Sequence, residues 1–184
     1  MTKKKIGPQT LLYPMPAVLV GTKIDNRPNF MTAAWSGIAC SKPPCISVAI
    51  QPIRYTHKWI LENQTFSINI PSADMVKEVD FCGIYSGKND DKSAIFSVFY
   101  GDVETAPLIE ECPLNFECNV IQSLELGSHT LFIGEVVETH VSDNCMTGRK
   151  IDTEKVDPLI FTASMRQYHR IGEAVAPAFS IGKK

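Results

Sequence analysis

Apolar residues recur along the chain in short runs and at alternate positions, the pattern expected of β-strands that bury one or both faces. The clearest case is the stretch 45–50, in which Ile46, Val48 and Ile50 alternate with smaller residues. Clusters of turn-forming residues bound most of these runs. The pattern predicts strands at 17–24, 29–35, 45–50, 64–70, 115–126 and 130–141, with a last apolar run at 159–161.

Turn chemistry joins several of these strands into hairpins. Residues 25–28 form a turn cluster before the strand at 29–35, and Gly127 and Ser128 join the two longest strands. The segment 41–44, SKPP, is expected to break the sheet, because neither proline can donate a ladder hydrogen bond. The polar stretches 85–92 and 143–157 are expected to form a loop and an exposed excursion.

Helical periodicity appears at few places. Residues 55–63 fit a short amphipathic helix. A second helix is expected further on, with Ser72 as its N-cap and Met75, Val76 and Val79 on its inner face. Mostly strands with two or three helices, at turn spacings that suit closure, predict a mainly β barrel. No glycine-rich fingerprint lies between a strand and a helix, so a Rossmann domain is not supported.

Length and charge limit the classes of function. A chain of 184 residues is expected to form a single domain, residues 1–184, with a sizeable core. The net charge of −2 argues against nucleic acid or an anionic membrane as the main partner. No apolar run approaches the roughly 20 residues of a membrane span and no signal sequence is evident, so a cytoplasmic location is expected.

Six cysteines are spread along the chain, at positions 40, 45, 82, 112, 118 and 145. In a cytoplasmic chain of this size we expect reduced thiols in the core rather than a disulfide framework. Their spacings include no tight Cys-x-x-Cys pair, so no metal site is expected. Cys40 and Cys45 adjoin the strand considered next, which leaves a redox role open for them.

The stretch 29–45 is the most informative part of the sequence. Small residues such as Ala33 and Ala34 run through the strand, so a flat ligand can lie directly against the backbone, whose N–H and C=O groups face its rim. Arg54 and Thr56 then supply a cation and a hydroxyl at the start of a helix, which suits a phosphate. A flat polar ring system with a phosphate tail describes flavin mononucleotide (FMN).

Five motifs in one order resemble the flavin reductase-like family of FMN-binding split barrels, and within it the flavoredoxin-type members. None of the motifs is specific alone, and the specificity lies in their order over nearly the whole chain. The resemblance implies a six-stranded FMN-binding split β-barrel that forms a homodimer, with the flavin near the subunit boundary. The motifs are GPQTLLYP at 7–14, MTAAW at 31–35, SKPP at 41–44, LGSHTLFIGEV at 126–136 and AFSIG at 178–182.

The resemblance also implies which residues hold the cofactor. The segment 32–36 would line the isoalloxazine ring and the ribityl chain, the start of the helix at 55–63 would bind the phosphate, and the loop at 85–92 would add a second phosphate contact. From the residues alone, that loop can equally be solvated and Asn69 can equally satisfy nearby backbone groups. The implied cofactor-binding residues are Thr32, Ala33, Ala34, Trp35, Ser36, Ser41, Arg54, Tyr55, Thr56, Asn69, Ser86, Gly87, Lys88 and Lys92.

Two further residues are implied to take part in the reaction. His129, within the motif at 126–136, would face the flavin or the nicotinamide and position the hydride donor or acceptor. Tyr168 matches a C-terminal aromatic residue that would cover the flavin. The remaining histidines have no pattern that distinguishes them from ordinary structural or surface residues.

The implied function is an FMN-containing oxidoreductase, a NAD(P)H:flavin or ferric reductase that passes a hydride or electrons through bound FMN. Its small-molecule partners would be a flavin and NADH or NADPH. One alternative is a flavoredoxin-like electron carrier with tightly bound FMN and a redox protein as its electron donor. A non-catalytic flavin-binding module is a further alternative. A pyridoxamine phosphate oxidase-like enzyme is disfavoured, because no second phosphate cluster is evident.

Overall fold

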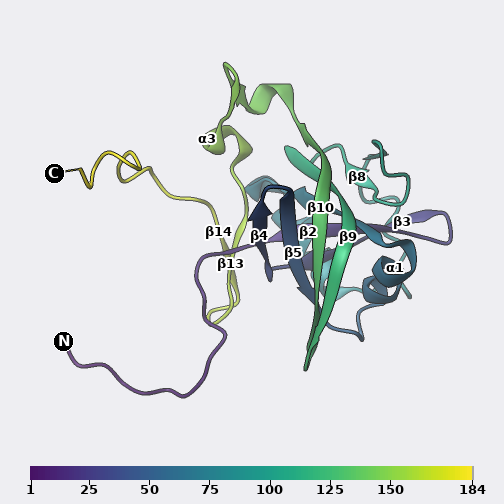
Figure 1. The fold of residues 1–184 in the computed structure, drawn as a ribbon, viewed down its shortest axis with the longest axis horizontal. Coiled ribbons are helices and arrows are strands. Elements are labelled where there is room, and N and C mark those ends of the chain that lie inside the picture. Colours follow the sequence, from purple (N-terminus) through teal and green to yellow (C-terminus); the bar gives the residue numbers. More distant parts are fainter. Residues whose placement is uncertain (184) are drawn as a thin grey trace.

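One curved antiparallel sheet forms the body of the protein in the computed structural model, which describes residues 1–183 (Figure 1). Within that range, seven strands pair in the order β3-β2-β6-β9-β10-β5-β4. The strands are β2 (Val18–Ile24), β3 (Arg27–Ala33), β4 (Ser36–Ser41), β5 (Pro44–Ile50), β6 (Thr65–Ile70), β9 (Leu114–Leu126) and β10 (His129–Val141).

The sheet curls until β3 meets β5. Cα atoms of the two strands approach within 8 Å of each other, although the sheet order does not pair them. Six strands of the described chain therefore enclose an interior, and β4 continues the sheet beyond β5. The mainly β fold with a few helices is confirmed, and the seam between β3 and β5 agrees with a split barrel.

The segment 41–44 does not break the sheet, so this expectation was wrong. Ser41 pairs with Pro44, and β4 and β5 form a hairpin through Lys42 and Pro43. Pro43 lies in the turn and Pro44 is the first residue of its strand, two positions where a missing N–H group costs no ladder bond. The sequence pattern missed β4 because its residues, Ile38 included, are largely exposed and show no alternation.

Two other hairpins follow the predicted turn chemistry. Asp25 and Asn26 adopt φ values of 46° and 65°, which suits a two-residue connection between strands. For this reason β3 begins at Arg27, two residues before the predicted start. Gly127, with φ of 59°, opens the connection between β9 and β10, whose bounds match the predicted strands to within one residue.

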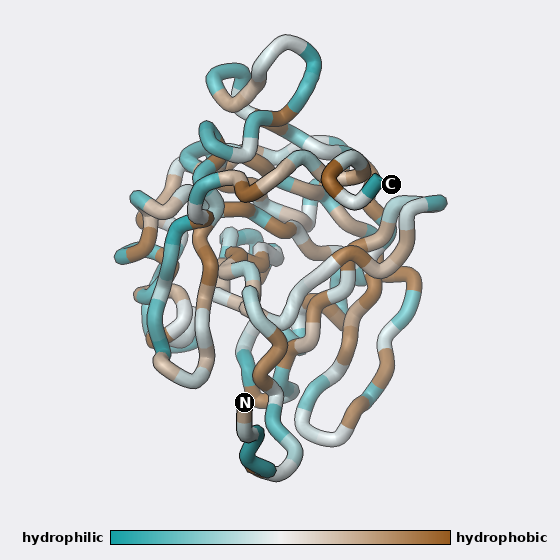
Figure 2. The backbone as a smooth tube through the Cα atoms, turned by 90° about the vertical axis from the view of Figure 1, so that its left-hand side faces the viewer, coloured by the Kyte–Doolittle hydropathy of each residue, from teal (hydrophilic) through white to brown (hydrophobic). Residues whose placement is uncertain are grey.

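Apolar side chains form two clusters, one on each side of the barrel wall. The first fills the barrel interior and includes Val48, Phe66 and Phe132. A Cβ atom on Gly134 would lie 2.6 Å from the Phe66 ring, so this glycine makes room for the central aromatic residue. The second cluster lies outside the barrel, against the second helix, and includes Phe30. In the backbone tube of Figure 2, hydrophobic stretches lie mostly toward the interior and hydrophilic ones mostly in the outer loops.

The helices lie at the edges of this barrel. The predicted helix at 55–63 is α1 (Tyr55–Asn63), with matching bounds. The second predicted helix consists of a 3-10 turn, η1 (Ala73–Met75), and α2 (Val76–Ile84), which packs on β3. Ser72 precedes η1 as predicted, but its side chain makes no capping hydrogen bond.

The segment 143–157 is more ordered than a simple excursion. It contains η2 (Asp143–Cys145), the two-stranded ribbon of β11 (Met146–Thr147) and β12 (Lys150–Ile151), and α3 (Thr153–Val156). Most of the segment is exposed, while Cys145 and Val156 are buried, and the Asp157 oxygen accepts a hydrogen bond from the Ala73 amide of η1.

The remaining strands are short. β1 (Met15–Pro16), β13 (Ile160–Thr162) and β14 (Gln167–His169) form one small sheet, and β7 (Val98–Phe99) pairs with β8 (Leu108–Ile109). Beyond them, the first and last residues of the described chain run as extended tails on one side of the barrel (Figure 1). Within residues 1–183, no helix is both long and apolar enough to cross a bilayer.

Candidate functional site

A small cavity lies where β3, the start of α1 and the end of α2 come together. It has a volume of about 130 Å³. The structure therefore brings together the two parts of the sequence that were predicted to bind phosphate, the start of α1 and the loop at 85–92, with Thr32 of the segment predicted to line the ring and the ribityl chain. Its lining includes Thr32, Arg54, Tyr55, Thr56, Ser86, Gly87 and Lys92. We call it the phosphate cavity.

The start of α1 is well suited to an anion. Arg54 precedes the helix, and no side chain caps the helix start or places a carboxylate in the first turn. The amide groups of the first turn and the helix dipole therefore give this end of α1 a positive potential. Arg54 is exposed, so its guanidinium can move onto a ligand and make a two-pronged contact.

Asn29 lines the adjoining polar cavity and connects β3 to two residues of the phosphate cavity, Thr56 and Gly87. Its side-chain Nδ2 donates to Thr56 Oγ1 over 2.9 Å, and the residue is buried. Because the Thr56 oxygen already accepts this bond, its own proton is free to point toward a ligand. The other face of the Asn29 amide packs against Gly87, where any Cβ atom would collide with the amide oxygen. Asn29 was not among the predicted site residues, and no local motif distinguishes it.

Lys92 brings a buried positive charge to the same cavity. Its Nζ atom donates to the backbone oxygens of Phe30 and Cys82, each over 3.0 Å. Burial lowers the pKa of Lys92, and the nearby charge of Arg54 acts in the same direction. An ammonium group has three donors, so one remains for a ligand after these two bonds. Lys92 therefore holds the loop in place and adds to the anion site.

The loop at 85–92 also borders a second, polar cavity of about 460 Å³. Lys88 lines this neighbour, which shares Tyr55, Gly87 and Lys92 with the phosphate cavity. The backbone N–H of Lys88 donates to Ser86 Oγ over 3.3 Å. Ser86 thus lines the phosphate cavity itself, whereas Lys88 lies in the adjoining space and reaches a phosphate only by bending its long side chain across.

A larger cavity of about 660 Å³ opens beside the connection from β3 to β4. We call it the ring cavity. Ala34, Trp35 and Ser36 line it on one side, and the N-terminal segment 9–16 lies opposite. The hydroxyl of Ser36 donates to the Ser47 oxygen over 2.9 Å, and the Ala49 amide donates to the Trp35 oxygen over 2.9 Å. Small side chains and a fixed backbone make this wall suitable for a flat ligand.

His129 stacks on Trp35, which lines the ring cavity. The His129 and Trp35 ring centroids are 4.3 Å apart and their planes differ by 26°. The Nδ1 atom of His129 shares a hydrogen bond with Ser128 Oγ over 2.8 Å. His129 does not itself line the ring cavity but contacts Trp35, which does, and its predicted place facing the flavin stays a prediction.

The two cavities are linked by one short piece of chain. Thr32 lines the phosphate cavity, and Ser36, four residues later, lines the ring cavity. Four extended residues span at most about 13 Å. Between them, Ala33 is buried toward the barrel core, and the Thr32 hydroxyl donates to the Val79 oxygen of α2. The side chains of Thr32 and Ala33 therefore shape the wall, and at these two residues chiefly the peptide groups remain for a ligand.

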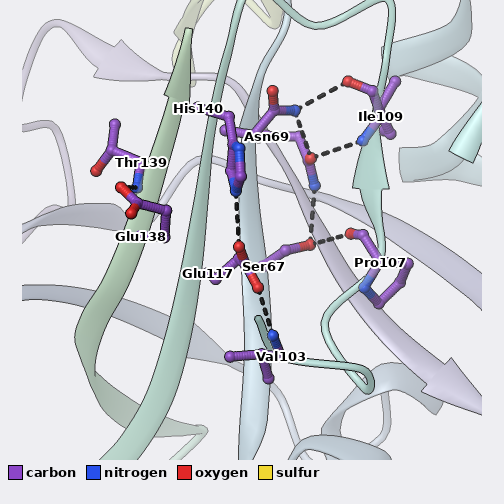
Figure 3. Close-up of polar contacts among 10 residues, drawn as sticks. Ser67, Asn69, Val103, Pro107, Ile109, Glu117, Glu138, Thr139 and His140 are labelled. Atoms are coloured by element: carbon purple, nitrogen blue, oxygen red, sulfur yellow. Dashed lines mark hydrogen bonds and ion pairs between the residues drawn. The ribbon is translucent and has the colours of Figure 1, made fainter. Parts of the chain in front are cut away.

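Asn69 is not brought to the site. It is fully buried, and its side chain bonds to Leu19, Ser67, Ile109 and Asn115 over 2.8–3.1 Å. Figure 3 shows the part of this network that joins Asn69 to Ser67 and Ile109. With both its donors and its acceptor occupied, Asn69 serves the fold, so its assignment as a cofactor ligand was wrong within this chain.

Ser41 and Tyr168 also lie apart from the two cavities. Ser41 sits at the turn end of the β4–β5 hairpin, the opposite end from Ser36. The Tyr168 hydroxyl donates to Asp80 Oδ1 over 3.0 Å, and burial, with Asp80 beside it, raises the pKa of Tyr168 to about 12. Neither residue lines the phosphate cavity or the ring cavity. Among residues 1–183, no cluster of three or more His, Cys, Asp or Glu side chains is placed to hold a metal ion.

Comparison with known proteins gives one consistent picture. The model of the flavin reductase like domain matches residues 10–172. A flavoredoxin from Methanosarcina acetivorans is 37% identical with a TM-score of 0.96, over 100% of this chain and 98% of that one. The flavoredoxin of Desulfovibrio vulgaris (Miyazaki F) is 43% identical with a TM-score of 0.91, over 99% and 100%. An FMN-binding protein from Thermus thermophilus, solved with bound p-hydroxybenzaldehyde, is 25% identical with a TM-score of 0.81, over 96% and 99%.

Proposed function

Because the chain belongs to the flavin reductase-like family, we propose that it is an FMN-containing oxidoreductase. The observation that carries this proposal is the pairing of a cationic phosphate cavity with a larger ring cavity at the two ends of residues 32–36. FMN has the matching shape, a flat ring joined to a phosphate by a flexible chain.

The residues present fit this cofactor. Arg54, Lys92 and the Thr56 hydroxyl, together with the first amides of α1, would hold the phosphate. The backbone at Ala34 and the indole of Trp35 would face the ring, where small residues permit close approach. When bound, the flavin supplies hydride acceptance and one-electron transfer, which no side chain of this site supplies.

The protein's part is binding, orientation and proton handling. The N-terminal segment 9–16 and Trp35 form walls of the ring cavity that would shield a bound ring from part of the solvent. The ring of His129 is held by its stack on Trp35 and by Ser128 at Nδ1. Within the described chain no hydrogen bond occupies its Nε2 atom, which leaves that atom free for a proton or a ligand beside Trp35.

The first form of the proposal is a NAD(P)H:flavin or ferric reductase. It is supported by the size of the ring cavity, about 660 Å³, which lies within the range of roughly 300–1,000 Å³ common for small-molecule sites. Apolar residues such as Leu12 and Leu131 line it beside the backbone wall. Such walls suit a second flat ring, the nicotinamide, as well as the first.

A second candidate is a flavoredoxin-like electron carrier. The similarity to two flavoredoxins over nearly the whole of each chain favours it. In this form the flavin stays bound between turnovers and a redox protein supplies the electrons. The two forms use the same cavities and differ in what approaches the ring.

One experiment tests both forms. The protein is purified without added cofactor, its visible spectrum is recorded, and NADH and NADPH are then added without oxygen. Flavin absorption bands at about 370 and 450 nm that bleach when a nicotinamide is added support the reductase. Bands that persist with both nicotinamides but bleach with dithionite support the carrier. Protein that is colourless and binds no added FMN would refute the assignment altogether.

The homodimer implied by the family stays a prediction. It is supported by large apolar side chains exposed on the described surface, among them Ile38 of β4 and Ile121 and Leu126 of the β9–β10 hairpin. Sedimentation equilibrium of the purified protein gives its mass directly. A mass of 20.4 kDa, that of one chain, would contradict the dimer.

A further inference from the structure

The β4–β5 hairpin places two cysteines opposite each other. Cys40 of β4 and Cys45 of β5 are register partners one step from the turn formed by Lys42 and Pro43. Directly opposed residues of antiparallel strands have side chains on the same face and Cα atoms about 4.5–5.5 Å apart. That separation lies within the roughly 4.4–6.8 Å that a disulfide bond requires.

The two thiols lie over the same turn. Cys40 Sγ donates to the Lys42 oxygen and Cys45 Sγ to the Pro43 oxygen, each over 3.4 Å. Burial raises the pKa of Cys45, and the neighbouring Cys40 thiol raises it further through its charge and a hydrogen bond. Cys40 is exposed whereas Cys45 is only 3% exposed. One thiol is therefore open to reagents and the other is shielded behind it.

We propose that Cys40 and Cys45 form a reversible thiol–disulfide site. The Cys40 thiolate attacks one sulfur of a small-molecule disulfide, such as oxidised glutathione, and displaces one thiolate from it. Cys45 then loses its proton and attacks the Cys40 sulfur, which forms the Cys40–Cys45 bond and releases the second thiol. The cysteine pair loses two electrons, and the small disulfide gains them with two protons as two free thiols.

The other cysteines lack this arrangement. Burial raises the pKa of Cys82 to about 11 and that of Cys118 to about 12, and burial also raises the pKa of Cys112. Cys145 is buried as well. Cys118 lies near enough to Cys45 for their charges to interact, so it is the competing partner that a test must distinguish. Unlike Cys45, none of these four buried thiols has the exposed Cys40 as its strand partner, and a buried thiol with a raised pKa starts exchange with a reagent slowly, because the thiolate is the nucleophile.

The position of the pair separates it from the flavin site. Neither cysteine lines the phosphate cavity or the ring cavity, and the opposite end of the same hairpin, at Ser36, Gly37 and Ser47, forms the wall of the ring cavity. The site therefore does not depend on the proposed cofactor. It can be tested on the protein with or without FMN.

Peptide mapping provides a direct test. The protein is incubated with oxidised glutathione, free thiols are alkylated, and the digest is made with trypsin, which does not cleave before Pro28 or Pro43. The tryptic peptide 24–54 then contains both Cys40 and Cys45 and no other cysteine. We expect it to lose the mass of two hydrogens, to take up no alkyl group, and to regain both thiols with dithiothreitol.

Variants make the outcome decisive. Cys45→Ser should trap glutathione on Cys40, because the resolving thiol is gone, whereas the matched control Cys145→Ser should leave the intrapeptide bond intact. The proposal is overturned by a link between peptide 24–54 and the peptide that contains Cys118. It is equally overturned by glutathione that remains on Cys40 in the unaltered chain, or by a peptide that stays fully alkylated.

Discussion

Replacing Asn29 by aspartate should weaken the binding of the FMN phosphate and leave the binding of the flavin ring largely unchanged. The Asn29 Nδ2 atom donates to Thr56 Oγ1 over 2.9 Å, which leaves the hydroxyl proton of Thr56 free for the phosphate. A carboxylate only accepts hydrogen bonds, so in Asn29→Asp the Thr56 hydroxyl must turn and donate to it. The phosphate then loses one donor and gains a negative neighbour.

The size of the effect follows from that exchange. A hydrogen bond to a charged group contributes about 1.5–3 kcal/mol, which corresponds to a factor of about 10 to 150 in Kd. Repulsion between the carboxylate and the phosphate acts in the same direction. Riboflavin has the ring and the ribityl chain but no phosphate, so its affinity should stay within about threefold. The ratio of the FMN affinity to the riboflavin affinity should therefore fall by about 10-fold or more.

The assay is a fluorescence titration of both flavins with flavin-free protein. Asn63→Asp is a matched control. Asn63 Nδ2 also donates to a threonine hydroxyl, Thr22 Oγ1, over 3.0 Å, and Asn63 lines neither cavity. If Asn29 acts through Thr56, both substitutions remove the same hydroxyl donor. The double variant Asn29→Asp/Thr56→Val should then bind FMN more weakly than Thr56→Val only by the repulsion between the carboxylate and the phosphate. An unchanged affinity ratio in Asn29→Asp would refute the reasoning. Unaltered protein that binds neither flavin would instead refute the proposed function.

Four further predictions concern single residues. Arg54→Ala should weaken FMN binding by about 1–3 kcal/mol through loss of charge-assisted hydrogen bonds, and an unchanged Kd in the same titration would remove Arg54 from the site. Gly87→Ala should weaken FMN binding more than riboflavin binding, because its Cβ atom would displace the loop from Asn29; equal losses for both flavins would contradict a local effect. His129→Ala should slow flavin reduction in stopped-flow measurements while FMN stays bound, and loss of the flavin would make His129 structural. Burial lowers the pKa of His57, so stability should fall as pH drops below about 6.5, by at most about 1.4 kcal/mol per pH unit, because the unfolded chain takes up the proton first. His57→Gln should flatten that part of a urea-midpoint profile against pH, and an unchanged slope would exclude His57 as its source.

Elements with strong local signals were predictable from the sequence. The alternation around Val48 defined β5, and the Asp25-Asn26 turn defined the β2–β3 hairpin. The bounds of α1 were also correct. β4 was missed because an exposed strand carries no alternation of buried and exposed residues, and Pro43 was read as a sheet breaker although turns accept it. Local pattern thus identifies elements that bury one face and fails for an edge strand that buries none.

The two asparagines explain why the site was only partly predictable. Both lie on strands and both are buried. The side-chain groups of Asn69 all bond to other residues of the barrel, whereas the bond from Asn29 to Thr56 leaves the hydroxyl proton of Thr56 free. The difference depends on a partner 27 residues away for Asn29 and on partners 40 and 46 residues away for Asn69. A short sequence motif does not contain both partners of such a hydrogen bond. A buried polar residue therefore becomes a functional candidate when its partner keeps a free donor at a cavity, and a structural one when the network closes on itself.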